Sequence, residues 1–174
     1  MTFDIRGFRS ALGCFPTGIA VMTAASPAAD AAPGSSAGLG EASHIGITVN
    51  SFTSVSLDPP LVLWCIDRRS RRYPFFANAP GFTISILAAG HRAVSARLAG
   101  PGEHSLDGIA LMATELGPPA LADALAIFEC TRESVQDAGD HAILLGRVQR
   151  FAQHDGAGAP LVYFQGKYGA LAQS

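Results

Sequence analysis

Apolar residues recur along this chain with two spacings, one helical and one extended. Ile5, Phe8, Leu12 and Phe15 stand three or four positions apart, which predicts a short amphipathic helix over residues 3–13. Two further helices are expected at residues 71–78 and 91–99. Runs that alternate or are rich in β-branched residues predict strands at 17–25, 44–53, 61–67, 82–87, 126–136, 141–152 and 161–165.

The order of these elements favours a mainly β fold. Short strands joined by turns, with only a few helices between them, are typical of a β-barrel and not of alternating βαβ units. Residues 26–42 are so rich in Ala, Gly, Ser and Pro that a long flexible loop is expected there. Residues 100–123 are expected to be irregular, because glycines and a proline pair interrupt them.

Length and composition narrow the possibilities. With 174 residues, the chain is expected to form a single domain over residues 1–174. Hydrophobic residues make up 48% of the chain and charged residues 15%, so part of the apolar surface is expected to close a subunit interface. A formal net charge of -2 gives no general electrostatic footprint for nucleic acid. A local basic patch is formed only by Arg68, Arg69, Arg71 and Arg72.

The cysteines and the first residues of the chain bear on where the protein is located. Cys14, Cys65 and Cys130 lie far apart without C-x-x-C spacing, so they are interpreted as buried thiols in a reducing compartment. The first residues contain no signal-like apolar block, and no later apolar run is long enough to span a bilayer. We therefore expect a cytoplasmic protein with no membrane association.

The histidines have no metal-binding spacing, so no metal site is expected.

Residues 46–60, GITVNSFTSVSLDPP, stop resembling an ordinary strand halfway along. Hydroxyl and amide side chains gather in this segment, at Thr48, Asn50, Ser51, Thr53, Ser54 and Ser56. If they are enclosed, these groups need hydrogen-bond partners, and a polar ligand with many acceptor atoms would supply them. The alternative is an edge strand with one solvated face, and composition alone leaves both interpretations open.

Residues 67–72, DRRSRR, directly follow the apolar run LVLWCI, so they leave a strand end, where ligand-binding loops are common. Arginine side chains at this place are suited to clamp a phosphate through paired hydrogen bonds. The alternative is a solvated helix start, with Asp67 or Ser70 as the N-cap. The two interpretations are compatible.

Gly139-Asp140-His141 lies between two apolar, β-rich runs, in a turn or at the first residue of the next strand. An imidazole at such a rim can donate to a carbonyl or a phosphate. The alternative is a plain turn, with glycine for a positive φ and an exposed histidine.

Several common site motifs are missing from the sequence. No G-x-G-x-x-G opens a helix after the first strand, so a Rossmann fold is not expected. No G-x-x-x-x-G-K-[ST] occurs, which excludes a P-loop. No serine stands in G-x-S-x-G. A bound nucleotide therefore needs another architecture.

Taken together, five segments resemble the flavin reductase family of two-component monooxygenases, the short-chain NAD(P)H:flavin oxidoreductases. The segments are Phe8-Arg9-x-Ala11-Leu12, TGIAV at 17–21, TVNSFTSVSLDPP at 48–60, GDH at 139–141 and PLVY at 160–163. Each is weak alone, but their order and spacing over nearly the whole chain are specific.

The resemblance implies an FMN-binding split β-barrel of Greek-key type, in a homodimer that uses NADH or NADPH to reduce FMN or FAD for a separate monooxygenase. It also implies that residues 48–56 and 67–72 embrace the flavin. The flavin ring would contact Thr48, Val49, Asn50 and Ser51, and the phosphate would contact Ser54, Ser56 and Ser70, with Asp67 and Arg71 in the same loop. His141 would lie near the nicotinamide and is the expected catalytic residue.

Two departures from the family pattern are visible. The loop at 26–42 is longer and richer in Ala and Gly than usual, and residues 68–72 are more basic. Extra positive charge would help to anchor the second phosphate of FAD, and both FMN and FAD stay open as the flavin. A non-catalytic flavin carrier and a related split-barrel flavin oxidase are the alternative functions.

Overall fold

The computed structural model describes residues 3–25, 44–100, 105–156 and 158–171. Within these ranges, every helix falls short of the length and apolar character that crossing a membrane requires. The predicted loop at 26–42 lies outside the described residues.

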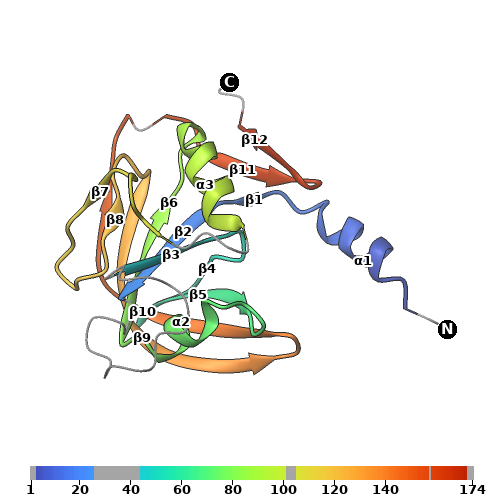
Figure 1. Cartoon of the computed structure of the whole chain (residues 1–174), viewed down its shortest axis with the longest axis horizontal. Coiled ribbons are helices and arrows are strands. Elements are labelled where there is room, and N and C mark those ends of the chain that lie inside the picture. Colours follow the sequence, from blue (N-terminus) through green and yellow to red (C-terminus); the bar gives the residue numbers. More distant parts are fainter. Residues whose placement is uncertain (1–2, 26–43, 101–104, 157, 172–174) are drawn as a thin grey trace.

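A seven-stranded antiparallel sheet forms the body of the molecule (Figure 1), in the order β3-β2-β6-β9-β10-β5-β4. Its strands are β2 (Ala20–Ala25), β3 (His44–Val49), β4 (Thr53–Leu57), β5 (Pro60–Asp67), β6 (Gly81–Ile86), β9 (Ala126–Ala138) and β10 (His141–Gln153). The sheet curls so that β3 approaches β5 without joining it in a ladder, which leaves a seam in the barrel. This is the split β-barrel that the resemblance implied.

Large apolar side chains fill the barrel interior. Trp64 lies against the rings of Phe76 and Phe82, with ring centroids 5.1 and 5.7 Å away. Met22 and Leu144 are fully buried in the same cluster. Strand alternation places Trp64, Phe82 and Leu144 inward, whereas Phe76 reaches the interior from helix α2 (Tyr73–Asn78).

Short elements surround the barrel (Figure 1). They are α1 (Ile5–Leu12), β1 (Thr17–Gly18), α2 (Tyr73–Asn78), the 3-10 helix η2 (Ala89–His91), α3 (Arg92–Ala99), β7 (Leu111–Met112), β8 (Ala120–Leu121), β11 (Leu161–Phe164) and β12 (Lys167–Ala170). Strands β1, β11 and β12 form a second small sheet, and β7 pairs with β8. A second apolar cluster, which includes Leu87, Leu98 and Leu161, packs between α3 and this small sheet. In Figure 1, α1 extends away from the body.

Helix α3 packs closely on β3 because residue 46 is glycine. A Cβ at Gly46 would lie 2.6 Å from the Leu106 side chain and 3.2 Å from that of Leu98, which closes the space to any larger residue. The last turn of α3 therefore lies beside the end of β3, which is where the candidate site is found.

The predicted elements are confirmed in the main, with informative differences. The predicted strand at 44–53 ends at Val49, and a separate edge strand, β4, begins at Thr53. The segment expected to be irregular contains the short pair β7 and β8, and β12 was not predicted. Cys130 is buried as expected, but Cys14 is exposed and Cys65 is only partly buried, so the prediction of three buried thiols was wrong for these two.

Candidate functional site

A cavity of about 650 Å³ opens at the seam where β3 ends beside β5. This volume lies within the range of small-molecule sites. It is lined by most of the residues that the sequence singled out, namely Thr48, Val49, Asn50, Ser51, Asp67, Ser70, Arg71 and His141. Ile47, Cys65, Ile66 and Ala99 also line it, together with Arg69 and Arg72 of the arginine cluster. Segments distant in sequence thus meet at one cavity.

Ser54 and Ser56 lie on β4, the edge strand next to β5, and are not among the residues that line this cavity. Ser54 is exposed and Ser56 is partly buried. A β-bulge between them shifts the register of β4 against β5. Their contact with the flavin phosphate, which the resemblance implied, stays a prediction.

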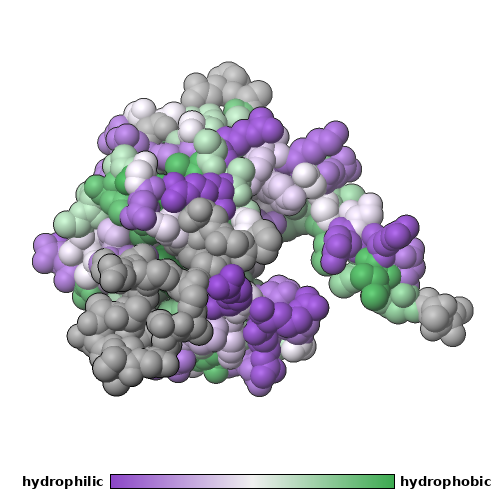
Figure 2. All heavy atoms as spheres, in the orientation of Figure 1, coloured by the Kyte–Doolittle hydropathy of each residue, from purple (hydrophilic) through white to green (hydrophobic). Residues whose placement is uncertain are grey.

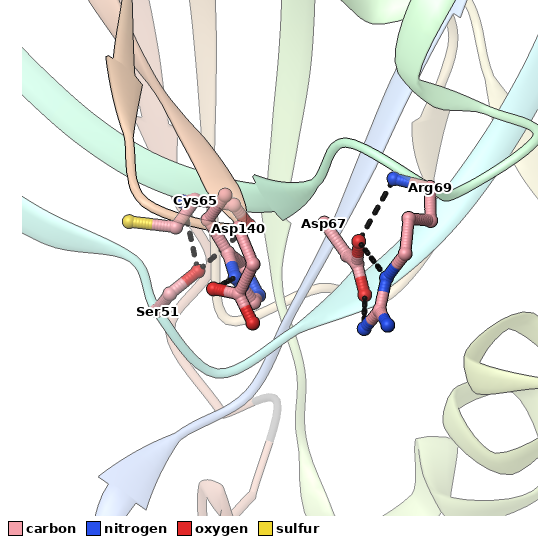
Figure 3. A network of polar contacts seen from close by, with 6 residues as sticks. Ser51, Cys65, Asp67, Arg69 and Asp140 are labelled. Carbon is pink, nitrogen blue, oxygen red and sulfur yellow. Dashed lines mark hydrogen bonds and ion pairs between the residues drawn. The ribbon is translucent and has the colours of Figure 1, made fainter.

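A serine bridges the seam of the barrel. The Ser51 hydroxyl accepts a hydrogen bond from the Cys65 backbone N–H at 2.9 Å and donates one to the Cys65 carbonyl at 3.2 Å (Figure 3). Because β3 and β5 are not paired, this side chain takes the place of a missing ladder contact. The turn after β3 is thereby held against β5 at the wall of the cavity.

Helix α3 holds the end of β3 from the other side. Thr48 donates its hydroxyl hydrogen to the Ser95 carbonyl on α3 at 2.9 Å. Asn50, which is exposed, contacts the Thr17 hydroxyl through its side-chain nitrogen at 3.3 Å. Two of the polar side chains of residues 46–60 therefore have partners within the chain, and their hydroxyl or amide groups remain at the cavity wall.

Asp67 and Arg69 form a closed pair on the rim of the cavity (Figure 3). The Asp67 carboxylate accepts from the Arg69 Nε at 3.1 Å, from its terminal nitrogen at 2.9 Å and from its backbone N–H at 2.8 Å. These hydrogen bonds lower the pKa of Asp67 to about 2. The pair presents little net charge to a ligand.

Two predicted N-caps do not cap α2. Asp67 bonds to the Arg69 N–H, and the Ser70 hydroxyl accepts from the Arg72 N–H at 3.2 Å, so both side chains stabilise the turn that precedes the helix. Helix α2 begins at Tyr73 without a side-chain cap. This leaves Ser70 in the cavity wall.

The arginines of residues 68–72 have different surroundings and different roles. Arg72 is buried and donates to the carbonyls of Leu98, Gly46 and Gly100, at 2.5 Å for Leu98 and 3.5 Å for Gly46. Arg68 pairs with Asp137 at 3.2 Å. Arg71 is exposed and lines the cavity. One basic stretch therefore supplies both a structural anchor and cations at the rim.

His141 is the first residue of β10, directly after the two-residue turn Gly139-Asp140, where Gly139 has a φ of +66°. The register places His141 opposite Asp67 of β5. The His141 Nδ1 lies 2.8 Å from the Asp140 carboxylate, and this hydrogen bond lowers the pKa of Asp140. An ionised carboxylate only accepts, so Nδ1 carries a proton and Nε2 is the nitrogen left for a ligand.

The lining of the cavity suits a flavin. Ile47, Val49 and Ile66 offer apolar surface for a flat ring, whereas hydroxyls, the Asn50 amide and the Arg71 guanidinium offer donors for ring and phosphate oxygens. The sequence missed Cys65, because a single cysteine in a strand carries no binding signal. Alternation in LVLWCI is the one clue that Cys65 faces away from buried Trp64.

Comparison with known proteins identifies the family of this chain. Residues 12–172 match the family model described as the flavin reductase like domain. The chain is 41% identical to the FMN reductase (NADH) SmoA of Agrobacterium fabrum, over 97% of this chain and 87% of that protein. It is 39% identical to the reductase component of a flavin-dependent trigonelline monooxygenase of Acinetobacter baylyi, over 98% of this chain but only 50% of that protein.

A solved structure shares the fold over nearly the whole chain. This is the Streptomyces globisporus NADH:FAD oxidoreductase SgcE6 in complex with NAD and FAD fragments. Its TM-score with this chain is 0.84, with 29% identity over 97% of this chain and 93% of that chain. The two proteins therefore share the overall fold.

Proposed function

This chain belongs to the flavin reductase-like family, and on that premise we propose that it is an NAD(P)H-dependent flavin reductase that supplies reduced flavin to a separate monooxygenase. The observation that carries the proposal is the cavity at the seam, where the turn after β3, the loop after β5 and His141 meet. The Acinetobacter relative is named as the reductase component of a monooxygenase, which supports the proposal of a separate monooxygenase partner.

The chain's own residues bind and orient the reactants. When bound, the reduced nicotinamide supplies a hydride to the flavin, which is chemistry that belongs to the two cofactors. In this proposal residues 48–51 hold the flavin ring, and Ser70 and Arg71 hold its phosphate together with Ser54 and Ser56. Asp67 keeps Arg69 in place at the rim. His141, oriented by Asp140, positions the nicotinamide through Nε2.

Either FMN or FAD fits this proposal, with NADH or NADPH as the reductant. SmoA is named an FMN reductase that uses NADH, and SgcE6 is named an NADH:FAD oxidoreductase, so relatives of both flavin types support it. Arg71, which lines the cavity and is exposed, supplies positive charge for the flavin phosphates, whereas the charge of Arg69 is offset by Asp67.

The protein is further proposed to act as a homodimer through α1. None of the residues of this helix is buried, and its apolar side chains stand in solvent (Figure 2), with Ile5 66%, Phe8 51% and Leu12 59% exposed. The flanking residues Phe3 and Phe15 are 72% and 76% exposed. Soluble monomers rarely expose so many adjacent apolar side chains. A second copy would cover them.

Light scattering tests the dimer. Phe8→Glu with Leu12→Glu is expected to halve the measured mass, whereas Arg6→Glu on the same helix is the control and should leave the dimer intact. A wild-type protein that is monomeric at micromolar concentration would contradict this part of the proposal.

A cytoplasmic location is also proposed, supported by three cysteines that are all free, as in a reducing compartment.

Nucleotide oxidation tests the activity directly. Purified protein is mixed with NADH or NADPH and with FMN, FAD or riboflavin, and the loss of absorbance at 340 nm is followed. Rapid oxidation in at least one combination is expected. Flavin binding without oxidation would indicate a carrier instead, and oxygen consumption with a small substrate but without nucleotide would indicate an oxidase.

A further inference from the structure

A second, smaller cavity adjoins the first. It measures about 200 Å³ and shares Thr48, Val49, Asn50 and Ala99 with the larger one, so the two meet at the end of β3. Its other walls are Ile19, Tyr163 and Tyr168. A space below the roughly 300 Å³ of a complete ligand site is suited to one part of a ligand whose remainder lies in the larger cavity.

Two tyrosines give this smaller cavity its chemistry. Tyr163 and Tyr168, which face each other across the β11–β12 hairpin, have ring centroids 5.6 Å apart with an interplanar angle of 69°. The Tyr168 hydroxyl lies 3.1 Å from the Ser95 hydroxyl on α3. The Arg92 guanidinium lies over the Tyr168 ring at 5.6 Å from its centroid. These contacts fix the Tyr168 ring before any ligand arrives, which lowers the entropic cost of binding.

The same helix connects the two cavities. Ala99, the last residue of α3, lines both of them, and Arg92, its first residue, contacts Tyr168. Thr48 in turn bonds to the Ser95 carbonyl. A ligand that reaches from the larger cavity into the smaller one therefore runs along α3 and ends among aromatic side chains, near an exposed arginine.

We propose that the smaller cavity is a subsite for the adenine ring of a dinucleotide whose reactive ring occupies the larger cavity. An aromatic, mostly apolar space accepts a flat base by stacking or edge-to-face contact. The Arg92 guanidinium, 5.6 Å from the centroid of the Tyr168 ring, adds positive charge next to this cavity, which favours a ligand that carries phosphate. The inference rests on the proposed function, because FAD and NAD(P)H are the adenine-bearing molecules of that reaction.

Binding measurements on Tyr168→Leu test this subsite. Flavin fluorescence gives the Kd for FMN and for FAD, and calorimetry gives the Kd for AMP as an isolated adenine probe. Loss of one stacking partner for a base is expected to weaken binding about tenfold. Tyr168→Phe, which keeps the ring, should retain most of the affinity. Phe164→Leu, an exposed aromatic of β11 outside both cavities, is the matched control.

The two sources of adenine give different results. If FAD supplies it, Tyr168→Leu weakens FAD and AMP about tenfold and leaves FMN within twofold. If the nicotinamide nucleotide supplies it, FAD and FMN are both unchanged, while AMP binding weakens and the KM for NADH rises with FMN as the flavin. Either result supports the subsite.

Equal weakening of FMN and FAD would overturn the proposal, because the cavity would then hold the flavin ring. Unchanged binding of FAD and AMP together with an unchanged KM would overturn it as well. Tyr163→Leu provides a second variant if Tyr168→Leu does not fold, as judged by thermal melting. The Kd values do not depend on turnover, so a wild-type protein that fails to oxidise NADH would refute the proposed function without deciding the subsite.

Discussion

The hydroxyl of Ser51 bonds to both backbone groups of Cys65, the N–H at 2.9 Å and the carbonyl at 3.2 Å. These two residues lie on opposite sides of the seam, since Ser51 follows β3 and Cys65 belongs to β5. Both also line the larger cavity. The contact that closes the barrel is therefore part of the wall that a flavin would touch, which couples barrel stability to cofactor binding.

Ser51→Ala is expected to affect stability and flavin affinity together. Removal of two hydrogen bonds at a partly buried backbone should cost about 1–3 kcal/mol in the free energy of unfolding. Chemical denaturation measures this cost, and fluorescence titration should show weaker FMN binding. Thr53→Ala is the control, because the Thr53 hydroxyl is exposed and reaches only the Ser54 carbonyl at 3.4 Å. Equal effects of the two substitutions would contradict the role of Ser51.

His141→Ala is expected to slow nucleotide oxidation about tenfold or more while leaving the Kd for flavin within twofold, because the side chain positions the nicotinamide. Steady-state kinetics and flavin titration measure the two quantities. Asp140→Asn should have a smaller effect in the same direction, since the imidazole then loses its carboxylate partner at 2.8 Å. His154→Ala is the control, because His154 does not line the larger cavity and its side chain bonds to the Ala124 carbonyl. A flavin carrier would bind flavin but show negligible nucleotide oxidation in every variant, the wild type included.

Arg72→Met is expected to destabilise the fold more than any other arginine substitution in residues 68–72. It removes charged hydrogen bonds to the carbonyls of Leu98, Gly46 and Gly100, which should cost about 2–5 kcal/mol. Urea unfolding measures the loss. Arg68→Met is the matched control, because its exposed ion pair with Asp137 should contribute less than about 1 kcal/mol. A similar midpoint for both variants would refute the assignment of Arg72 as a buried anchor.

The phosphate contacts can be separated from the ring contacts by comparing FMN with riboflavin, which lacks the phosphate. Ser70→Ala is expected to weaken FMN about tenfold or more and to leave riboflavin unchanged, because the loss of one hydrogen bond to a charged group costs about 1.5–3 kcal/mol. The same pattern is predicted for Ser54→Ala from the family resemblance. Asn50→Ala, at the ring, should weaken both flavins. A Ser54→Ala protein that binds FMN like the wild type would place the phosphate on the Ser70 side alone.

Alkylation should distinguish the three cysteines as pH rises. Burial, with the nearby Glu129 charge, raises the pKa of Cys130 to about 12, and burial also raises the pKa of Cys65. The reactive thiolate forms only as pH approaches the pKa, so exposed Cys14 should react with iodoacetamide first, Cys65 at higher pH, and Cys130 only after unfolding. Peptide mass spectrometry measures this order. Added FMN should protect Cys65 but not Cys14, and protection of neither would argue against flavin in the larger cavity.

Much of the fold follows from local pattern. Inward and outward residues alternate along parts of β9 and β10, and the turn between them contains Gly139, which adopts a positive φ. Their hairpin can therefore be predicted from the sequence. The end of β3 was harder to place. Asn50 and Ser51 continue a strand-like pattern in the sequence, but β3 ends at Val49, and the Ser51 hydroxyl bonds to the backbone of Cys65 across the seam. Short strands such as β7 and β12 carry too few residues to show a period.

The sequence by itself determined which chemical groups are available: a hydroxyl-rich segment, a basic loop and a histidine after a tight turn. Their order along the chain also indicated the family. Only the tertiary structure decided which of them share a cavity, because the register of β10 on β5 sets His141 beside Asp67 and the curl of the sheet brings Thr48 toward both. It also buried Arg72 while leaving Arg71 at the rim, and it placed Tyr168 beside the site. Contacts between residues so distant in sequence depend on long-range pairing and packing, which no local pattern encodes.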